Sequence, residues 1–194
     1  MTAIDDTLSA RPGRPRDQRL DDAIVAATID LLGERGYSAL SLAAVADRAG
    51  TTTPAIYRRW ASKADLVLSA VFRTAADDVI ADTGDLDADI RAMVRWSLEK
   101  FASPAGRAAV AGMLGEPNRS GGRPSELAAV WDRTGERLAR AVERGEIRDG
   151  IDADALILQL AGPAMLAAAL QGKGAASDEW VERITTVILD GVRA

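Results

Sequence analysis

A polar and basic group of residues between Leu40 and Lys63 has the side chains and the spacing for contacts with nucleic acid. Hydroxyl groups can donate hydrogen bonds to phosphate oxygens, and a guanidinium can bond a phosphate or a guanine edge through two parallel hydrogen bonds. Part of this group lies on one face of a predicted short helix, and that face is short enough to fit a major groove. The residues left for solvent on the second of two short helices are Thr52, Thr53, Pro54, Tyr57, Arg58 and Arg59.

Two short helices that flank a tight turn must position these side chains. Ser41 is a natural N-cap for the first helix, and apolar residues follow at helical spacing up to Ala49. Gly50 relieves the left-handed backbone conformation that such a turn usually requires. Pro54 suits the first turn of the second helix, where backbone amides have no intrahelical acceptor to lose. The pattern predicts a helix-turn-helix.

The chain of 194 residues contains neither histidine nor cysteine. This composition excludes disulfides, zinc fingers, iron–sulfur clusters and histidine-ligated metals. It also excludes a Ser-His-Asp triad and a cysteine nucleophile. No cluster of carboxylates has the spacing of metal ligands or of a general acid–base pair. We therefore expect no catalytic residue, no metal and no cofactor.

The charge is unevenly distributed along the chain. The whole sequence has 24 Lys and Arg against 29 Asp and Glu, a net charge of −5. Residues 11–63 contain nine basic and six acidic side chains, or +3, whereas residues 64–194 contain fifteen and twenty-one, or −6. The basic part is where contact with nucleic acid is expected, although a charge of +3 is by itself a weak signal.

The helix-turn-helix also carries a family pattern. Its most specific parts are Ala46…Ala49-Gly50, then Ile56-Tyr57-x-x-Trp60, then Ser62-Lys63-x-x-Leu66. With these residues the stretch from about Arg14 to Leu66 resembles the tetracycline-repressor (TetR) family of one-component regulators. Two positions depart from the family pattern: Thr51 stands where an aliphatic residue is usual, and Ala43 where a polar or basic residue is frequent.

The resemblance implies a DNA-binding transcriptional regulator, most commonly a repressor that binds a palindromic operator as a homodimer. A small apolar effector in the C-terminal part would release it from DNA. The alternative is a helical small-molecule carrier or scaffold without specific DNA binding, which Thr51 and Ala43 alone favour.

The resemblance and the chemistry of the side chains together suggest roles. Thr52 would offer its hydroxyl and the first amides of its helix to a phosphate. By the resemblance, Tyr57 and Lys63 would contact phosphates. Thr53, Pro54, Ala55 and Arg59 would face bases. Arg59 alone of these could bond guanine in bidentate fashion, Pro54 and Ala55 could touch a thymine methyl, and Arg58 could serve either role.

Trp60 is expected in the core and Ser62 as a helix cap. The predicted DNA-binding residues are Arg14, Arg16, Ser41, Thr52, Thr53, Pro54, Ala55, Tyr57, Arg58, Arg59 and Lys63.

The segment Arg11-Pro12-Gly13-Arg14-Pro15-Arg16 precedes the first helix. Arginine on an extended, proline-stiffened backbone suits a narrow minor groove of negative potential. A disordered basic tail with unspecific phosphate attraction is an equal alternative.

The remaining pattern predicts an all-α protein of about nine helices. We expect three parts: residues 1–16 as a flexible basic arm, residues 17–63 as the helix-turn-helix domain, and residues 64–194 as a helical effector-binding and dimerisation domain. The helices are expected at 17–35, after Ser41, from about 52 to 59, from Ser62 to about 82, and at 87–101, 104–114, 125–143, 152–171 and 177–192.

The stretch from Ala155 to Leu170 is the most apolar in the chain. It is shorter than the roughly 20 residues of a membrane span and contains Gln159 and a Gly162-Pro163 pair. We expect a helix buried on most sides by the core or by a partner chain. No basic-then-apolar signal sequence opens the chain, so a cytoplasmic location is expected.

The C-terminal part carries large, adaptable side chains that could line an apolar cavity, although an ordinary core is the alternative. The predicted ligand-binding residues are Met93, Trp96, Phe101, Met113, Leu114, Trp131 and Met165. Two apolar stripes on the last two helices could form a four-helix dimer interface, unless a monomer uses them internally. The predicted interface residues are Leu156, Leu160, Ala164, Ala167, Ala168, Val181, Ile184, Val187 and Ile188.

Overall fold

The computed structural model describes residues 18–76, 82–115, 125–171 and 177–193, with the backbone alone at 74–76, 113, 125–127 and 171. Within these ranges the chain is all-helical, apart from an isolated antiparallel bridge between Ile147 and Arg193. The helices are α1 Gln18–Ala39, α2 Leu42–Arg48, α3 Thr53–Tyr57, α4 Lys63–Ala76, α5 Leu86–Ala102, α6 Pro104–Gly115, α7 Ser125–Glu143, α8 Ala153–Gln171 and α9 Asp178–Val192.

The predicted fold class is confirmed, and most helix ends lie within one or two residues of the predicted ones. α1 shows the largest described difference. Gly36 has φ 71° and ψ 175°, so regular helix ends there as expected, but a further short helical segment follows the kink up to Ala39. The predicted end of the fourth helix near Asp82 adjoins residues 77–81, which are outside the described residues.

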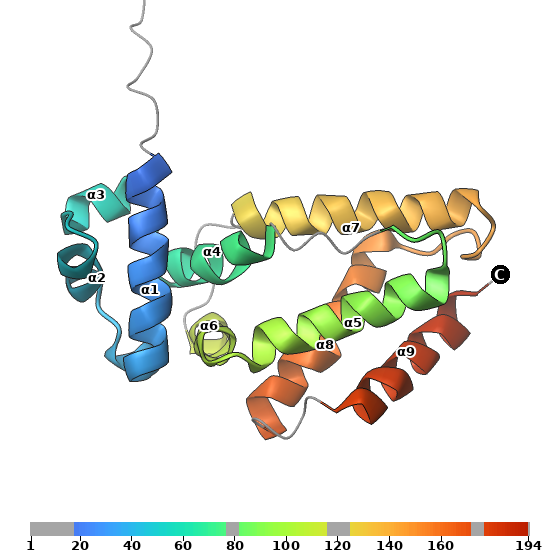
Figure 1. Cartoon of the computed structure of the whole chain (residues 1–194). Coiled ribbons are helices and arrows are strands. Elements are labelled where there is room, and N and C mark those ends of the chain that lie inside the picture. The colour runs from blue at the N-terminus through green and yellow to red at the C-terminus, as the bar shows by residue number, and fades with distance from the viewer. Residues whose placement is uncertain (1–17, 77–81, 116–124, 172–176, 194) are drawn as a thin grey trace, which may run out of the picture.

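Helices α1, α2 and α3 pack together at one end of the molecule, at the left of Figure 1. Gly50, with φ 65°, makes the tight turn between α2 and α3. Val45 from α2 and Ile56 from α3 are completely buried against Ile24 of α1. Trp60 is 9% exposed in the same core, as expected. The small apolar core therefore fixes how α3 is presented.

Helix α4 leads from this end to α5–α9 (Figure 1). Helices α1 and α4 both contact α6, and α4 also contacts α7. The α1–α6 contact is close, because a Cβ added to Gly112 would lie 2.4 Å from the Tyr37 ring. The helix-turn-helix end is thus joined to the rest of the chain through α1 as well as through α4.

Helix α8 packs one face against α5. Its window Ala153–Leu170 is the single candidate membrane span in the described part of the chain, judged by length and composition, and 33% of that window is buried. A core helix meets the same two criteria. Leu158, Leu166 and Leu170 are 59%, 58% and 75% exposed. The helix is therefore less buried within its own chain than the sequence predicted.

Candidate DNA-binding surface and effector cavity

The outward face of α3 consists of polar and basic side chains. Thr52, Pro54, Tyr57 and Arg58 are exposed, Tyr57 to 57%, and Thr53 is partly exposed. The pattern follows from the core, because Ile56 points inward and the residues on the opposite side of the short helix must point outward. Five of the predicted DNA-binding residues therefore share one accessible surface.

Ala55 does not belong to that surface. It is 5% exposed and lies beside Ile56 on the buried side of α3. The predicted contact between its methyl group and a thymine is therefore wrong. Pro54 is exposed and keeps the apolar contact with a base as a prediction.

Two hydroxyl groups stabilise the helices that present the surface. Ser41 is the N-cap of α2, where its Oγ accepts a hydrogen bond from the backbone N–H of Ala44 at 3.2 Å. Thr52 is the N-cap of α3 and accepts from the N–H of Ala55 at 3.4 Å. These hydroxyls accept in the caps, so each can still donate to a phosphate. Phosphate contacts at Ser41 and Thr52 remain predictions.

Arg59 is engaged within the protein. Its Nε forms an ion pair with Asp21 of α1, and its Nη1 donates to the carbonyl oxygen of Ala55 at 3.1 Å. The side chains of Arg59 and Asp21 are only 15% and 12% exposed. The prediction that Arg59 reads a guanine is corrected, because its guanidinium links α3 to α1 and is turned into the protein. The sequence offered one sign of this partner: Asp21 lies three residues before the buried Ile24, on the apolar side of α1.

Lys63 also has partners inside the protein. Its Nζ donates to the carbonyl oxygens of Tyr37 and Leu40, at 3.3 and 3.5 Å, and lies 4.0 Å from the centroid of the Tyr37 ring. A cation is favourable at the C-terminal end of α1, where carbonyl groups lack helical donors. Lys63 therefore ties the start of α4 to the end of α1, and its phosphate contact stays a prediction. Arg14 and Arg16 lie outside the described residues.

The Arg59→Ala variant is expected to lose stability of about 1–3 kcal/mol, between the values for exposed and fully buried ion pairs. The substitution leaves Asp21 poorly solvated and without its cation. Urea unfolding followed by circular dichroism measures the loss. Arg58→Ala is the matched control, expected within about 0.5 kcal/mol of the parent because Arg58 is exposed. Equal stability of the two variants would show that the Asp21 pair is unimportant to the fold.

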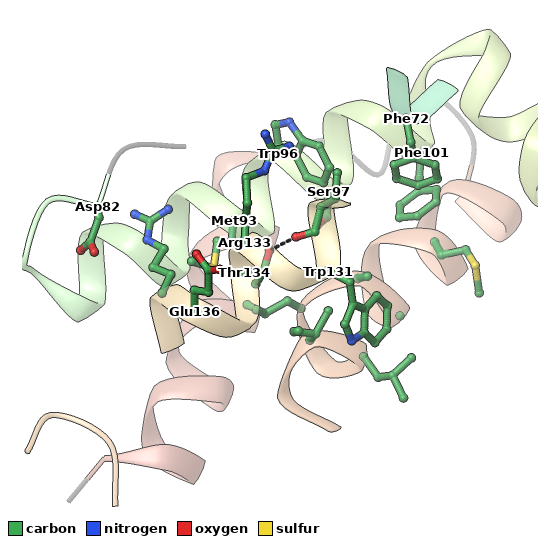
Figure 2. Close-up of a pocket in the computed structure, with 18 of the residues that line it drawn as sticks. Phe72, Asp82, Met93, Trp96, Ser97, Phe101, Trp131, Arg133, Thr134 and Glu136 are labelled. Atoms are coloured by element: carbon green, nitrogen blue, oxygen red, sulfur yellow. Dashed lines mark hydrogen bonds between the residues drawn. The ribbon is translucent and has the colours of Figure 1, made fainter. Parts of the chain in front are cut away.

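A cavity of about 450 Å³ lies among α4, α5, α7 and α8 (Figure 2). This volume is within the range of roughly 300–1,000 Å³ that is typical of small-molecule sites. The predicted cavity residues that line it are Met93, Trp96, Phe101, Trp131 and Met165. Leu114 was predicted wrongly: it is 72% exposed and does not line the cavity. The side chain of Met113 lies outside the described ones.

Several lining residues were not indicated by the sequence pattern. Phe72 reaches the cavity from α4, and Ser97 and Thr134 face it from α5 and α7. Three arginines of α7 also form part of the cavity wall: Arg137, which is buried, and Arg133 and Arg140, which are exposed to solvent as well.

A buried ion pair lies at the polar end of the cavity. The Nη2 of Arg137 is 2.8 Å from Asp89 Oδ1, and the two side chains are 7% and 4% exposed. Thr83 completes the site, since its backbone N–H and its hydroxyl both donate to Asp89, at 3.1 and 2.6 Å. Each oxygen of this buried carboxylate thus accepts at least one hydrogen bond.

A second pair lies beside it, nearer to solvent. Arg140 Nε donates to Asp82 at 2.7 Å, and the guanidinium holds the pKa of this carboxyl below its usual value. The backbone N–H of Gly84 and the charge of Arg144 lower the pKa of Asp82 further. The two pairs connect α7 to the first turn of α5, through Asp89, and to the segment before it, through Asp82.

The predicted dimer stripe on α8 is wrong. Its five members face the interior of their own chain, each with an exposed fraction of 6% or less: Leu156, Leu160, Ala164, Ala167 and Ala168. Apolar residues occur all around α8, so the sequence pattern did not identify which side meets α5. The monomer uses this stripe in its own core, which is the alternative to a dimer interface that the sequence left open.

The predicted interface residues on α9 are partly buried and partly exposed. Val181 and Ile188 are buried in the chain, whereas Ile184 is partly exposed and Val187 is 70% exposed. We call the exposed side chains Leu158, Leu166, Leu170 and Val187, together with the partly exposed Ile184, the outer face of α8 and α9. Leu158 also lines the cavity.

The fold and these sites define a helix-turn-helix protein that also has a helical bundle with a cavity. This is the architecture of a one-component regulator. A family described as "Bacterial regulatory proteins, tetR family" matches residues 24–70, and "Tetracyclin repressor-like, C-terminal domain" matches residues 80–188. The chain belongs to the TetR family and is a DNA-binding transcriptional regulator of that family. The alternative of a carrier or scaffold without DNA binding is not supported by these matches.

Relatives extend over nearly the whole chain. The "Uncharacterized HTH-type transcriptional regulator YdeS" of Bacillus subtilis is 27% identical over 96% of each chain. The "DNA-binding transcriptional repressor TetR" of Mycobacteroides abscessus is 28% identical over 90% of this chain and 94% of its own. The crystal structure of the TetR family transcription regulator SCO0332 has a TM-score of 0.68 and 26% identity, covering 91% of this chain and all of its own.

Proposed function

We propose that this regulator is a repressor that binds a palindromic operator as a homodimer and leaves it when a small apolar effector enters the cavity. The observation that carries the proposal is the position of α4. This helix follows the helix-turn-helix and also supplies Phe72 to the cavity wall. A molecule in the cavity can therefore shift the population between arrangements of α4 and so between DNA-binding and released states.

Repression, rather than activation, is supported by the relative with the longer match. The repressor of Mycobacteroides abscessus aligns over 94% of its length, whereas the "HTH-type transcriptional activator FasR" of Mycolicibacterium smegmatis aligns over 40% of its length. We further propose that the protein acts in the cytoplasm and that it has no enzymatic activity.

The outer face of α8 and α9 supports a dimer. It places four large apolar side chains that are more than half exposed on two helices: Leu158, Leu166, Leu170 and Val187. Large apolar side chains left exposed on two helices in contact commonly mark an interface. A two-fold axis there would form a four-helix contact and give the assembly two copies of α3. Half-sites about 34–36 Å apart, centre to centre, would then each receive one α3 in the major groove.

The test uses a duplex selected from a random library by the full-length protein, with fluorescence anisotropy as the measurement. We expect a palindromic selection product, a loss of affinity on the order of 100-fold when one half-site is scrambled, and a linear fall of log affinity with log salt. The control variant Leu166→Glu/Val187→Glu places charges on the outer face and should sediment as a folded monomer with no preference for the palindrome. A parent protein that binds palindromic and scrambled duplexes equally well would contradict the proposal.

A further inference from the structure

The aromatic residues of this chain are concentrated around the cavity. The whole sequence contains eight aromatic side chains: four Trp, two Tyr and two Phe. Both phenylalanines and two of the tryptophans line this one cavity. They come from three helices, Phe72 from α4, Trp96 and Phe101 from α5, and Trp131 from α7. Half of the aromatic residues thus surround one small volume.

Three of these rings form a cluster, and Figure 2 shows Phe72 and Phe101 at the end of the cavity away from Asp82. Phe72 and Phe101 meet edge to face, with centroids 5.9 Å apart and an interplanar angle of 71°. Phe72 also lies 6.5 Å from Trp96, tilted by 45°. Rings at such separations attract one another through their quadrupoles as well as through apolar contact. A further ring entering here would gain both contributions, whereas an aliphatic chain would gain only the second.

The charges of the cavity wall are already balanced. Arg137 is paired with Asp89, and Arg140 is paired with Asp82. The remaining charged lining residues, Arg133 and Glu136, are exposed and opposite in sign. A charged ligand at the buried pair would have to compete with the partner of Arg137, and separating that pair is strongly unfavourable. The Asp82–Arg140 pair is 28% and 48% exposed and resists a charged ligand less. An uncharged ligand leaves both pairs intact.

We propose that the cavity takes an uncharged aromatic molecule whose ring packs against Phe72 and Phe101, with its polar atoms toward the arginine-lined end. This inference rests on the proposed function, because it names the chemical class of the effector. It also assigns Phe72 a particular role. A ligand ring that touches Phe72 touches α4 directly, since Phe72 is a residue of that helix.

The experiment uses isothermal titration calorimetry of the full-length protein with four probes of related shape. Naphthalene-2-carboxamide is the uncharged aromatic probe, 2-naphthoate and 2-naphthylmethylammonium carry opposite charges on the same ring system, and octanamide is an uncharged aliphatic amide. We expect naphthalene-2-carboxamide to bind at least about tenfold more tightly than each of the other three. The Phe101→Leu variant should weaken its binding about tenfold and change octanamide binding little.

Tighter binding of a charged probe or of octanamide would overturn the inference, and so would the absence of carboxamide binding up to its solubility limit. The parent protein gives this comparison without any variant, so a folding defect in Phe101→Leu leaves the test intact. The proposed function is examined separately by adding each probe to the protein on its selected duplex. DNA binding with an unexpected probe preference would overturn the ligand class alone. If naphthalene-2-carboxamide binds but DNA affinity is unchanged, the proposed release from DNA by an effector is wrong. The inferred ligand class is then still supported.

Discussion

The Asp89→Ala variant is expected to be less stable than the parent protein by about 3–5 kcal/mol. The substitution leaves the Arg137 guanidinium buried, at 7% side-chain exposure, without the carboxylate that now accepts two of its N–H groups. It also removes the shorter of the two hydrogen bonds that the Thr83 hydroxyl donates, leaving the carbonyl oxygen of Asp85 at 3.4 Å. Urea unfolding monitored by circular dichroism gives the difference in free energy.

Asp87→Ala supplies the matched control for this prediction. Asp87 lies on the same helix and pairs with Arg193, but the two side chains are 41% and 50% exposed. Exposed pairs contribute roughly 0–1 kcal/mol, so this variant should unfold almost as the parent does. If the two alanine variants lose the same stability, burial of the Asp89–Arg137 pair is not what makes it important.

Local sequence signals were sufficient to predict the helices and the outward position of the polar face of α3. Ser41 is the N-cap of α2 as expected, and Ser62, expected as the cap of α4, accepts from the backbone N–H of Asp65. Gly50 makes the turn that its position predicted. These features depend on residues within a few positions of one another, so a single sequence records them. Trp60 is buried as expected and lies four positions after the buried Ile56, whose carbonyl oxygen accepts from its N–H.

The error at Arg59 came from a contact between distant segments. Arg59 is 38 positions from Asp21, and nothing in the spacing around Arg59 itself indicates that partner. An arginine beside an exposed arginine was therefore assigned the same outward direction. The fold separates them, because Arg58 ends α3 on its exposed side while Arg59 turns back to α1.

Helix α8 shows a second limit of periodicity. When apolar residues surround a helix, burial against one neighbour cannot be assigned to a particular side from the sequence. Leu160 and Leu158 are equally apolar, but one is 3% and the other 59% exposed. The cavity was predicted in part, because the large, adaptable side chains on α5 and α7 are of the kind that line apolar cavities.

The Tyr57→Phe/Arg58→Ala variant is expected to bind the selected operator on the order of 100- to 1,000-fold more weakly than the parent protein. Each lost contact between a donor and a phosphate or a base contributes roughly 1–3 kcal/mol, and every 1.4 kcal/mol is a factor of ten. Both side chains are exposed, so thermal unfolding should be unchanged. Fluorescence anisotropy at several salt concentrations measures the affinity, with Arg183→Ala on α9 as an arginine control far along the chain from α3.

The single Arg58→Ala variant then separates the two roles open to this side chain. If Arg58 contacts a phosphate, the slope of log affinity against log salt should fall by about 0.9 for each subunit, and all sequences should weaken alike. If it reads a base, the slope should change little and the preference at one position of each half-site should relax. Full operator affinity in the double variant, with the fold intact, would mean that the outward face of α3 does not enter the groove.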